Sequence, residues 1–242
     1  MHEVREKAMG INRTALARMI DHTQLAATAT RGDIERLCAE ARQYGFASVC
    51  ANPVHVPLAA RLLAGSDVAV CTVVGFPLGA DGTDDKAGQA GNALWHGATE
   101  VDMVIDIGAA KEHRWDAVEQ DIAAVVRVAH GGVAAGIVKV ILETCYLTDD
   151  EIAQACRCAV RAGADFVKTS TGFATPRDAD GNAIPNGATV AAVSLMRRTV
   201  GAGMGVKASG GIRTAQAAQA MIAAGATRIG TSSGVAILTA WE

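Results

Sequence analysis

The sequence predicts a single domain over residues 1–242, with the α/β architecture of a (β/α)8 TIM barrel and an added amino-terminal helix. Strand-like runs of β-branched residues alternate with helical patterns along the chain. A glycine followed by Ala or Phe, at Gly45, Gly97, Gly163 and Gly225, repeatedly closes a helix and opens a strand. With 242 residues, 50% of them hydrophobic, the chain has the length of one such barrel. A doubly wound open sheet is the alternative, but no G-x-G-x-x-G motif follows the first predicted strand.

The first half of the chain begins the alternation of helices and strands. Apolar residues at helical spacing before Met19 predict the added helix. Thr30 and Asp33 have the spacing of an amino-terminal cap, and Gly45 is a typical stop signal, so they bound the next helix. The predicted elements are, in order, a helix ending at 19, a strand at 20–23, a helix at 30–45, a strand ending at Cys50, a helix at 53–65, a strand at 68–74 and a loop at 75–82.

The second half repeats this scheme with clearer signals. Thr148 and Glu151 form a capping box ahead of an amphipathic helix. Strands alternating with helices reach a count of about eight, which is that of the barrel. The predicted elements are a strand at 101–107, a helix at 115–126, a strand at 137–142, a helix from 148 through 159, a strand at 164–168, a loop at 181–187, a helix at 190–200, a strand at 206–208, a helix at 215–223, a strand at 228–231 and a short final helix.

The recurring glycines also predict which residues lie at the same level of the barrel. Counting five residues on from each of them leads to Cys50, Asp102, Lys168 and Gly230. If the four units are equivalent β/α repeats, these residues lie at a similar height near the carboxyl ends of their strands. That end of the barrel is where such folds place their active sites.

Two lysines at the ends of predicted strands are the first candidates for chemistry. Alternation puts Lys168 on the same face as Phe166 and opposite Val167. A lysine on an interior face is poorly hydrated as an ammonium group, so its neutral, nucleophilic amine becomes available near pH 7. Lys207 follows another apolar run, and two ammonium groups placed close together oppose each other's charge.

Two central strands carry further ionisable residues on one face each. Alternation puts Lys139 and Glu143 on one face of their strand, and Asp102 and Asp106 on one face of theirs. We expect these faces to line the interior, so that carboxylates stand beside lysines. A buried ion-pair network would explain the pattern without catalysis. Buried lysines are rare, however, and three of them together with carboxylates favour an active site.

Loops rich in glycine and hydroxyl residues follow the last two predicted strands. They span residues 209–214 and 230–234, and the second opens the short final helix. Exposed backbone N–H groups, hydroxyls and a helix amino terminus favour a dianion, and barrels commonly bind phosphate in these two loops. Ordinary turn chemistry is the alternative.

The composition and charge of the chain indicate which classes of ligand it binds and where in the cell it is located. A net charge of −3 and a pI of about 6.1 give no basic surface for nucleic acid or anionic lipid, so we expect a small-molecule ligand. The charged segment 1–7 lacks the apolar core of a signal peptide, and the apolar run at 131–142 is too short for a membrane span, so we expect a cytoplasmic protein. The six scattered cysteines contain no C-x-x-C pair, so neither a disulfide framework nor a metal site is expected.

Five motifs, distributed over nearly the whole chain, together resemble deoxyribose-phosphate aldolases. They are Ile-Asp21-His-Thr, Glu-Val-Asp102-Met-Val-Ile, Val-Lys-Val-Ile-Leu-Glu143-Thr, Asp-Phe-Val-Lys168-Thr-Ser-Thr-Gly and Gly-Val-Lys207-Ala-Ser-Gly-Gly-Ile-Arg. The resemblance implies a class I aldolase on a (β/α)8 barrel. Such an enzyme reversibly cleaves 2-deoxy-D-ribose 5-phosphate to acetaldehyde and D-glyceraldehyde 3-phosphate, with neither a metal nor another cofactor.

The resemblance also implies roles for individual residues. Lys168 would be the Schiff-base nucleophile, and Lys207 the charged neighbour that keeps the amine of Lys168 deprotonated. Asp102 would act as acid and base, directly or through a bound water. Asp21, Lys139 and Glu143 would support this centre. The positions that match the phosphate cradle of the family are Gly172, Gly210, Gly211, Gly230, Ser232 and Ser233.

The chain departs from the family pattern at three places. Some members end in a tail with a tyrosine implicated in proton transfer, whereas this sequence ends at Trp241-Glu242. Phe173 stands where some members have a lysine near the phosphate, so we expect backbone groups to carry more of the anion binding. Asp106 stands where relatives often have asparagine.

Two other functions remain open from the sequence. A phosphosugar isomerase or epimerase would use Glu143 or Asp102 as its base and a lysine only as an electrostatic partner. A non-catalytic phosphosugar-binding barrel would bind the ligand without turnover. The resemblance favours small phosphosugar and aldehyde substrates and a homo-oligomer, with a dimer as the preferred form.

Overall fold

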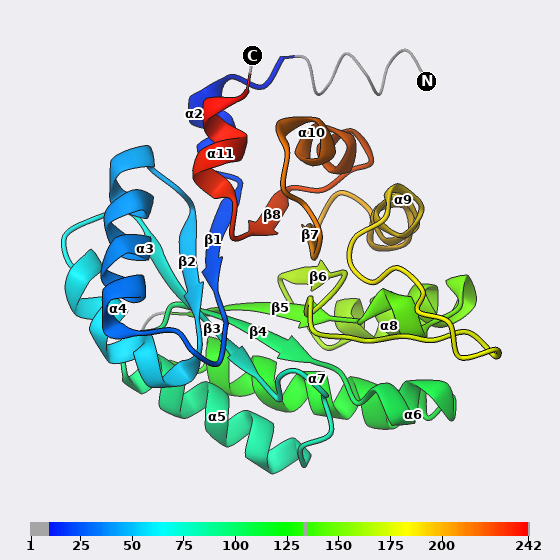
Figure 1. Ribbon diagram of the computed structural model, residues 1–242. Coiled ribbons are helices and arrows are strands. Elements are labelled where there is room, and N and C mark those ends of the chain that lie inside the picture. Colours follow the sequence, from blue (N-terminus) through cyan, green and yellow to red (C-terminus); the bar gives the residue numbers. More distant parts are fainter. Residues whose placement is uncertain (1–9, 133–134, 242) are drawn as a thin grey trace.

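The structure, a computed structural model, is a closed barrel of eight parallel strands that follow one another around the ring in sequence order (Figure 1). It describes residues 10–132 and 135–241. The predicted TIM barrel is therefore confirmed. The sequence-based inference that segment 1–7 is not a signal peptide concerns residues outside the described ones.

Each strand pairs in parallel with both of its neighbours. In β1, for example, Asp21 is the partner of Ser48 on one side and of Gly230 on the other, and this pairing closes the ring. The strands are β1 (Ile20–Gln24), β2 (Ser48–Ala51), β3 (Ala69–Val74), β4 (Glu100–Val104), β5 (Ile137–Ile141), β6 (Phe166–Lys168), β7 (Gly205–Ser209) and β8 (Arg228–Thr231).

Helices surround the ring, and the added helix α2 precedes the first strand (Figure 1). None of the helices in the described part of the chain is both long and apolar enough to cross a membrane. The α-helices are α2 (Arg13–Ala17), α3 (Arg31–Tyr44), α4 (Val56–Leu63), α5 (Thr83–Trp95), α6 (Ile107–Lys111), α7 (Trp115–His130), α8 (Asp149–Arg161), α9 (Val190–Val200), α10 (Ala215–Ala223) and α11 (Gly234–Thr239), and short 3-10 helices lie at η1 (Pro53–His55) and η2 (Thr144–Tyr146).

Capping residues and a terminating glycine that the sequence predicts set several of the helix boundaries. Thr30 and Asp33 form a reciprocal capping box at the start of α3, and Thr148 and Glu151 form another at the start of α8. Gly45 ends α3 in the left-handed conformation with φ 67°, which glycine adopts without steric cost. These three predictions are confirmed.

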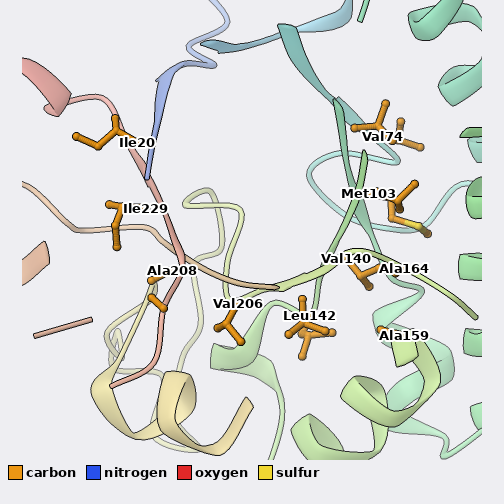
Figure 2. Close-up of a cluster of buried hydrophobic side chains, with 14 of the residues drawn as sticks. Ile20, Val74, Met103, Val140, Leu142, Ala159, Ala164, Val206, Ala208 and Ile229 are labelled. Carbon is orange, nitrogen blue, oxygen red and sulfur yellow. The ribbon is translucent and has the colours of Figure 1, made fainter. Parts of the chain in front are cut away.

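The main hydrophobic core lies between the outer face of the barrel and the helices. Figure 2 shows Val140 and Leu142 of the fifth β/α unit pointing outward, with Ala159 of α8 nearby. Val138, Val140 and Leu142 all belong to this core, whereas Lys139 is on the opposite face of the strand. Alternation therefore divides β5 as predicted, with apolar residues toward the helices and the lysine inside.

The two described ends of the chain meet on one side of the barrel, where Figure 1 shows α2 beside α11. The indole Nε1 of Trp241 donates to the backbone oxygen of Ile11 over 2.7 Å, and Nε of Arg13 donates to the oxygen of Trp241 over 2.8 Å. These bonds join the start of the described chain, at α2, to the residue that follows α11.

Strand β4 differs from its prediction at its end. A strand was expected at 101–107, but β4 ends at Val104 because Asp106 caps a short helix, accepting a bond of 2.9 Å from the backbone N–H of Ala109. Asp106 therefore does not stand in an interior column with Asp102, and that expectation was wrong. Helix α5 was not assigned from the sequence.

Candidate active site

Asp102 lies at the centre of a buried cluster of lysines. Its Oδ2 accepts from Nζ of Lys168 and from Nζ of Lys207, each over 2.7 Å, and its Oδ1 accepts from Nζ of Lys139 over 2.9 Å. Asp102 and Lys139 have no exposed surface, and Lys168 and Lys207 are 3% and 1% exposed. Strands β4, β5, β6 and β7 are successive in the ring, so their inward positions converge on one carboxylate.

A second set of charges lies beside the first. Oδ2 of Asp21 is 2.5 Å from Nζ of Lys207, and Oδ1 of Asp21 accepts from Arg228 over 2.6 Å. Oε2 of Glu100 is 2.5 Å from Nζ of Lys139. The linked ion pairs therefore contain the three carboxylates Asp21, Glu100 and Asp102 and four basic groups.

The network fixes the charge of several of its members. Burial alone would raise the pKa of Asp102, but the three lysines around it, Lys139, Lys168 and Lys207, outweigh that effect and hold the pKa well below its usual value. Burial likewise opposes the charge of Lys207, yet Asp102 and Asp21 raise the pKa of this amine above its usual value. Lys207 is thus held as an ammonium group.

Burial also opposes the charge of Lys139, and its acidic neighbours, Asp102 first among them, raise its pKa well above the usual value. Lys139 touches the carboxylates of Asp102, Glu100 and Asp21, and Lys207 touches those of Asp102 and Asp21. Among the carboxylates of residues 10–132 and 135–241, Lys168 contacts only that of Asp102, and it shares Oδ2 of Asp102 with Lys207.

A cavity of about 350 Å³ opens at the carboxyl ends of the strands. Of the three interior lysines, Lys168 alone lines it. The other lining residues come from the last residues of β1, β7 and β8 and from the loops after β1, β6, β7 and β8. They are Thr23, Gln24, Leu25, Ala26, Thr171, Phe173, Ser209, Gly210, Gly211, Ile212, Arg213, Gly230, Thr231 and Ser232. The cavity thus has an amine at its base and glycine, hydroxyl and guanidinium groups along its wall.

Most of the predicted phosphate positions line this cavity. Gly210, Gly211, Gly230 and Ser232 are lining residues, whereas Gly172 and Ser233 are not among them. At Gly210, with φ 87°, an added Cβ would lie 2.7 Å from the Cα of Gly187. Only glycine fits such a close approach of two backbones, which brings the loop after β7 against the segment leading to α9.

Glu143 is not among the residues that line this cavity, but it lines a neighbouring cavity of about 450 Å³, and Phe173 borders both. Glu143 is 1% exposed, and its Oε2 accepts from the backbone N–H of Thr171 over 3.1 Å and from the hydroxyl of the same residue. Burial raises the pKa of Glu143, although the bonds from Thr171 favour the carboxylate. Glu143 has the left-handed φ of 55°, so it departs from the strand geometry that the alternation of β5 assumed.

The four residues that the recurring glycines placed at one height of the barrel, Cys50, Asp102, Lys168 and Gly230, lie close together in the structure. Ligand atoms of Cys50 and Asp102 lie within 4.8 Å of each other, Asp102 contacts Lys168, and a Cβ on Gly230 would lie 2.9 Å from Cε of Lys207. The four positions therefore gather around one centre at the carboxyl ends of the strands.

The sequence reasoning missed several members of the site. Glu100 precedes Asp102 by two residues and Arg228 precedes Gly230 by two, so period-two alternation could have placed both inside the barrel. Thr171 had no comparable signal, and Arg213 lies in the loop 209–214 that the sequence assigns to phosphate binding but was not singled out. They reach the cavity through the conformation of loops, which a pattern of alternation does not specify.

Comparisons with known proteins identify the family of the chain. Residues 15–240 match the DeoC/LacD family aldolase. The chain is 58% identical to a deoxyribose-phosphate aldolase of Geobacillus sp. (strain WCH70) over 92% of this chain and 94% of the relative. It is 57% identical to a protein of the same name from Carboxydothermus hydrogenoformans over 94% of this chain and 96% of the relative.

A solved structure is similar along nearly its whole length. It is the deoxyribose phosphate aldolase from Aeropyrum pernix, described as having a unique tetrameric structure, with 34% identity and a TM-score of 0.87 over 98% of this chain and 96% of that one. The family match, the two relatives and this structure all cover the strands that carry the interior lysines. The chain belongs to the DeoC/LacD aldolase family.

Proposed function

We propose that the protein reversibly cleaves 2-deoxy-D-ribose 5-phosphate to acetaldehyde and D-glyceraldehyde 3-phosphate as a class I aldolase. The observation that carries this proposal is the position of Lys168, which lines the cavity while Lys139 and Lys207 stay behind it in ion pairs. The names of the relatives at 58% and 57% identity give the substrate.

Lys168 is the nucleophile in this proposal. Its neutral amine adds to the aldehyde carbon of the open-chain sugar, and loss of water gives an iminium ion. The iminium group accepts the electron pair of the bond between C2 and C3 as that bond breaks. The products at this stage are the free D-glyceraldehyde 3-phosphate and an enamine of acetaldehyde on Lys168.

Asp102 and Lys207 move the protons. Asp102, directly or through a water molecule, takes the proton of the C3 hydroxyl as the carbonyl of the first product forms. The enamine is then protonated at C2, and water releases acetaldehyde from the lysine. Lys207 is the proton donor in this scheme, because its ion pairs with Asp21 and Asp102 keep it protonated beside the carboxylate that it shares with Lys168.

The loops after β7 and β8 bind the phosphate in this proposal. Gly210, Gly211 and Ser232 line the cavity and offer backbone N–H groups and a hydroxyl, and Arg213 brings a guanidinium group to the same wall. Phe173 lines the cavity too, so the segment after β6 contributes an apolar surface where some relatives have a lysine. Gly172 and Ser233 would act through the conformation of their loops.

In this scheme the supporting residues Asp21, Lys139 and Glu143 position other groups and do not react themselves. Lys139 and Asp21 hold Asp102 and Lys207 in place through ion pairs, and Glu143 holds the loop that contains Thr171. The position of Glu143, bound to a loop rather than aimed at the cavity, disfavours an isomerase that would use it as the base. The scheme needs no metal and no organic cofactor.

A cleavage assay tests the proposal. The protein should release acetaldehyde from 2-deoxy-D-ribose 5-phosphate, and Lys168→Met should lose the activity because no amine remains to form the iminium ion. Lys111→Met is the matched control, since Lys111 is a lysine at the surface, 2.8 Å from Glu151, and it should keep the activity. Cleavage that survives in Lys168→Met, or proton exchange into the sugar without cleavage, would contradict the proposal.

The expected homo-oligomer and the cytoplasmic location stay predictions. The Aeropyrum pernix structure is tetrameric, and Trp95 at the end of α5 is 86% exposed in the single chain, a large aromatic surface that a second copy could cover. The mass of the protein in solution tests self-association, and a dimer remains the preferred form. Cell fractionation tests the location.

A further inference from the structure

We propose that Cys50, Cys71 and Asp102 form a binding site for a thiophilic divalent cation such as Zn²⁺ or Cd²⁺, and that the cation inhibits the enzyme when it binds. The two cysteines are 21 residues apart, so no spacing in the sequence suggests a metal site. The barrel nevertheless makes them direct partners, because Cys50 of β2 pairs with Cys71 of β3.

The three side chains have the spacing of ligands. The two Sγ atoms and a carboxylate oxygen of Asp102 all lie within 4.8 Å of one another, and Sγ of Cys71 is 3.2 Å from Oδ1 of Asp102. In a tetrahedral zinc site, metal–ligand distances of about 2.0–2.3 Å place neighbouring ligand atoms roughly 3.5–3.8 Å apart. Side-chain movements of about 1 Å or less therefore bring the three ligand atoms to these separations.

The chemistry of the donors selects soft cations. Two thiolates with one carboxylate favour Zn²⁺ and Cd²⁺ over Mg²⁺ and Ca²⁺, which prefer oxygen ligands. Three protein ligands leave a fourth position open, as in catalytic zinc sites. Here that position would hold water or a hydroxyl group of a bound sugar.

The charge of the interior is compatible with such an ion. Binding releases the protons of two thiols, and two thiolates balance the two positive charges of the cation. The cation would use Oδ1 of Asp102 and Sγ of Cys71, which both now accept from Nζ of Lys139, over 2.9 and 3.4 Å. Lys139 keeps Glu100, whose Oε2 is 2.5 Å away, so its ammonium group is not left unpaired.

The other oxygen of Asp102 need not change its partners. Oδ2 stays with Lys168 and Lys207 at 2.7 Å, so the cation and the two lysines can share one carboxylate. A metal-bound carboxylate is a weaker base, because the cation withdraws its electron density. Inhibition follows directly if Asp102 moves the protons of the proposed reaction.

The cation has a route to this site from the cavity. Leu25 lines the cavity and also packs, with Val73 and Phe76, in the small apolar cluster that contains both cysteines. A rotation of this one side chain would connect the cavity with the thiols. The apolar cluster also lowers the local dielectric constant, which strengthens the bonds between ion and thiolates.

Titration of the fully reduced, chelator-treated protein with Cd²⁺ tests the site without reference to activity. We expect one equivalent of Cd²⁺ to produce a thiolate-to-metal charge-transfer absorption in the ultraviolet and to release two protons. Cys50→Ser and Cys71→Ser should each lose the absorption. Cys145→Ser is the matched control, since Cys145 is half-buried in η2, away from the pair in the fold, and this variant should keep it.

Circular dichroism of each variant separates loss of the site from loss of the fold, and Cys50→Ala gives a second variant at the same position. An absorption that persists in both Cys50→Ser and Cys71→Ser, or its absence from the wild-type protein, would overturn the proposed site.

The inhibition of cleavage depends on the proposed function and is measured separately. Cleavage should fall with the same Cd²⁺ dependence as the absorption rises, and a chelator should restore it. Full activity of the Cd²⁺-loaded protein would overturn the inhibition while leaving the site in place.

Discussion

Asp102 shows how one carboxylate can bring side chains from several strands together. Its two oxygens accept from three lysines, and each lysine comes from a different strand. Lys139 and Lys207 also contact other carboxylates, whereas in the described part of the chain Lys168 contacts only an oxygen of Asp102 that it shares with Lys207. Lys168 is therefore the basic group that the network holds least firmly, and it is also the one that faces the cavity.

Glu143 gives a prediction at the scale of a single residue. In Glu143→Gln, an amide NH₂ replaces one of the oxygens that accept from Thr171, so a buried donor meets another donor. A mispaired buried group costs about 1–3 kcal/mol. Because Thr171 lines the cavity, we expect KM for the phosphorylated sugar to rise by about tenfold, equivalent to about 1.4 kcal/mol, with a smaller fall in kcat.

Steady-state kinetics of Glu143→Gln measure this change, and Glu112→Gln is the control because Glu112 forms an ion pair at the exposed surface with Arg114. Unchanged KM in Glu143→Gln would show that the bond to Thr171 does not shape the cavity. A fall confined to kcat would instead give Glu143 a part in the chemical step.

At the scale of elements, helix α5 explains why part of the fold escaped prediction. Its buried face consists of Lys86, Ala90 and Ala93, so a lysine occupies a position where the periodicity requires an apolar residue. The two capping boxes and the alternation in β5 were readable because each depends on neighbouring residues alone. The pairing of Lys86 with Asp121 of α7 depends on contacts between distant segments, which local patterns do not contain.

In the candidate site too, features that depend on neighbouring residues were predictable, and features that depend on tertiary contacts were not. The interior positions of Lys168, Lys207 and Asp102 follow from alternation and were predictable. The end of β4 was not, because Asp106 could continue a strand or cap a helix, and only its bond to Ala109 decides between them. The pairing of Cys50 with Cys71 depends on the register between β2 and β3, which the sequence does not state.

Lys86 supplies the prediction at this scale. Its Nζ is fully buried, donates to the backbone oxygen of Val104 over 3.0 Å and lies 2.6 Å from Oδ2 of Asp121, so it ties the end of β4 to α7. Lys86→Met leaves the carboxyl of Asp121 buried without its partner, and we expect a loss of about 3–5 kcal/mol in the free energy of unfolding.

Chemical denaturation measures that loss. The double variant Lys86→Met/Asp121→Leu should recover much of it, because no unpaired charge then remains. Arg18→Met is the surface control, since Arg18 and Asp67 are mostly exposed and their ion pair is worth about 0–1 kcal/mol. Equal effects of Lys86→Met and Arg18→Met would contradict the account of this buried pair.

At the scale of the whole molecule, the interior charges predict how stability depends on pH. In the folded protein, Asp21 and Asp102 have pKa values below their ordinary value of 3.8. Their contribution to stability is therefore present above about pH 4, and it is lost as the pH falls through their lowered pKa values. Lys139 and Lys207 have pKa values above 10.5, so their contribution is present below that pH and is lost as the pH rises beyond it.

The free energy of unfolding should therefore show a broad plateau with a fall at each end. The raised pKa of Glu143 acts in the opposite sense near pH 4.5, since its carboxylate is the form that folding disfavours, and it reduces the slope there. Denaturation across the pH range measures the curve. Asp102→Asn should lower the plateau and flatten the acid limb, and an acid limb unchanged in that variant would show that the network does not set it.

The central claim for the whole molecule is that its barrel presents one reactive amine to the sugar. Reductive trapping tests it most directly: the protein is treated with borohydride in the presence of acetaldehyde or 2-deoxy-D-ribose 5-phosphate, digested, and analysed by mass spectrometry. We predict a single reduced adduct on Lys168, the lysine that lines the cavity, and none in Lys168→Met. An adduct confined to another lysine, or no adduct from a protein that cleaves the sugar, would contradict the account.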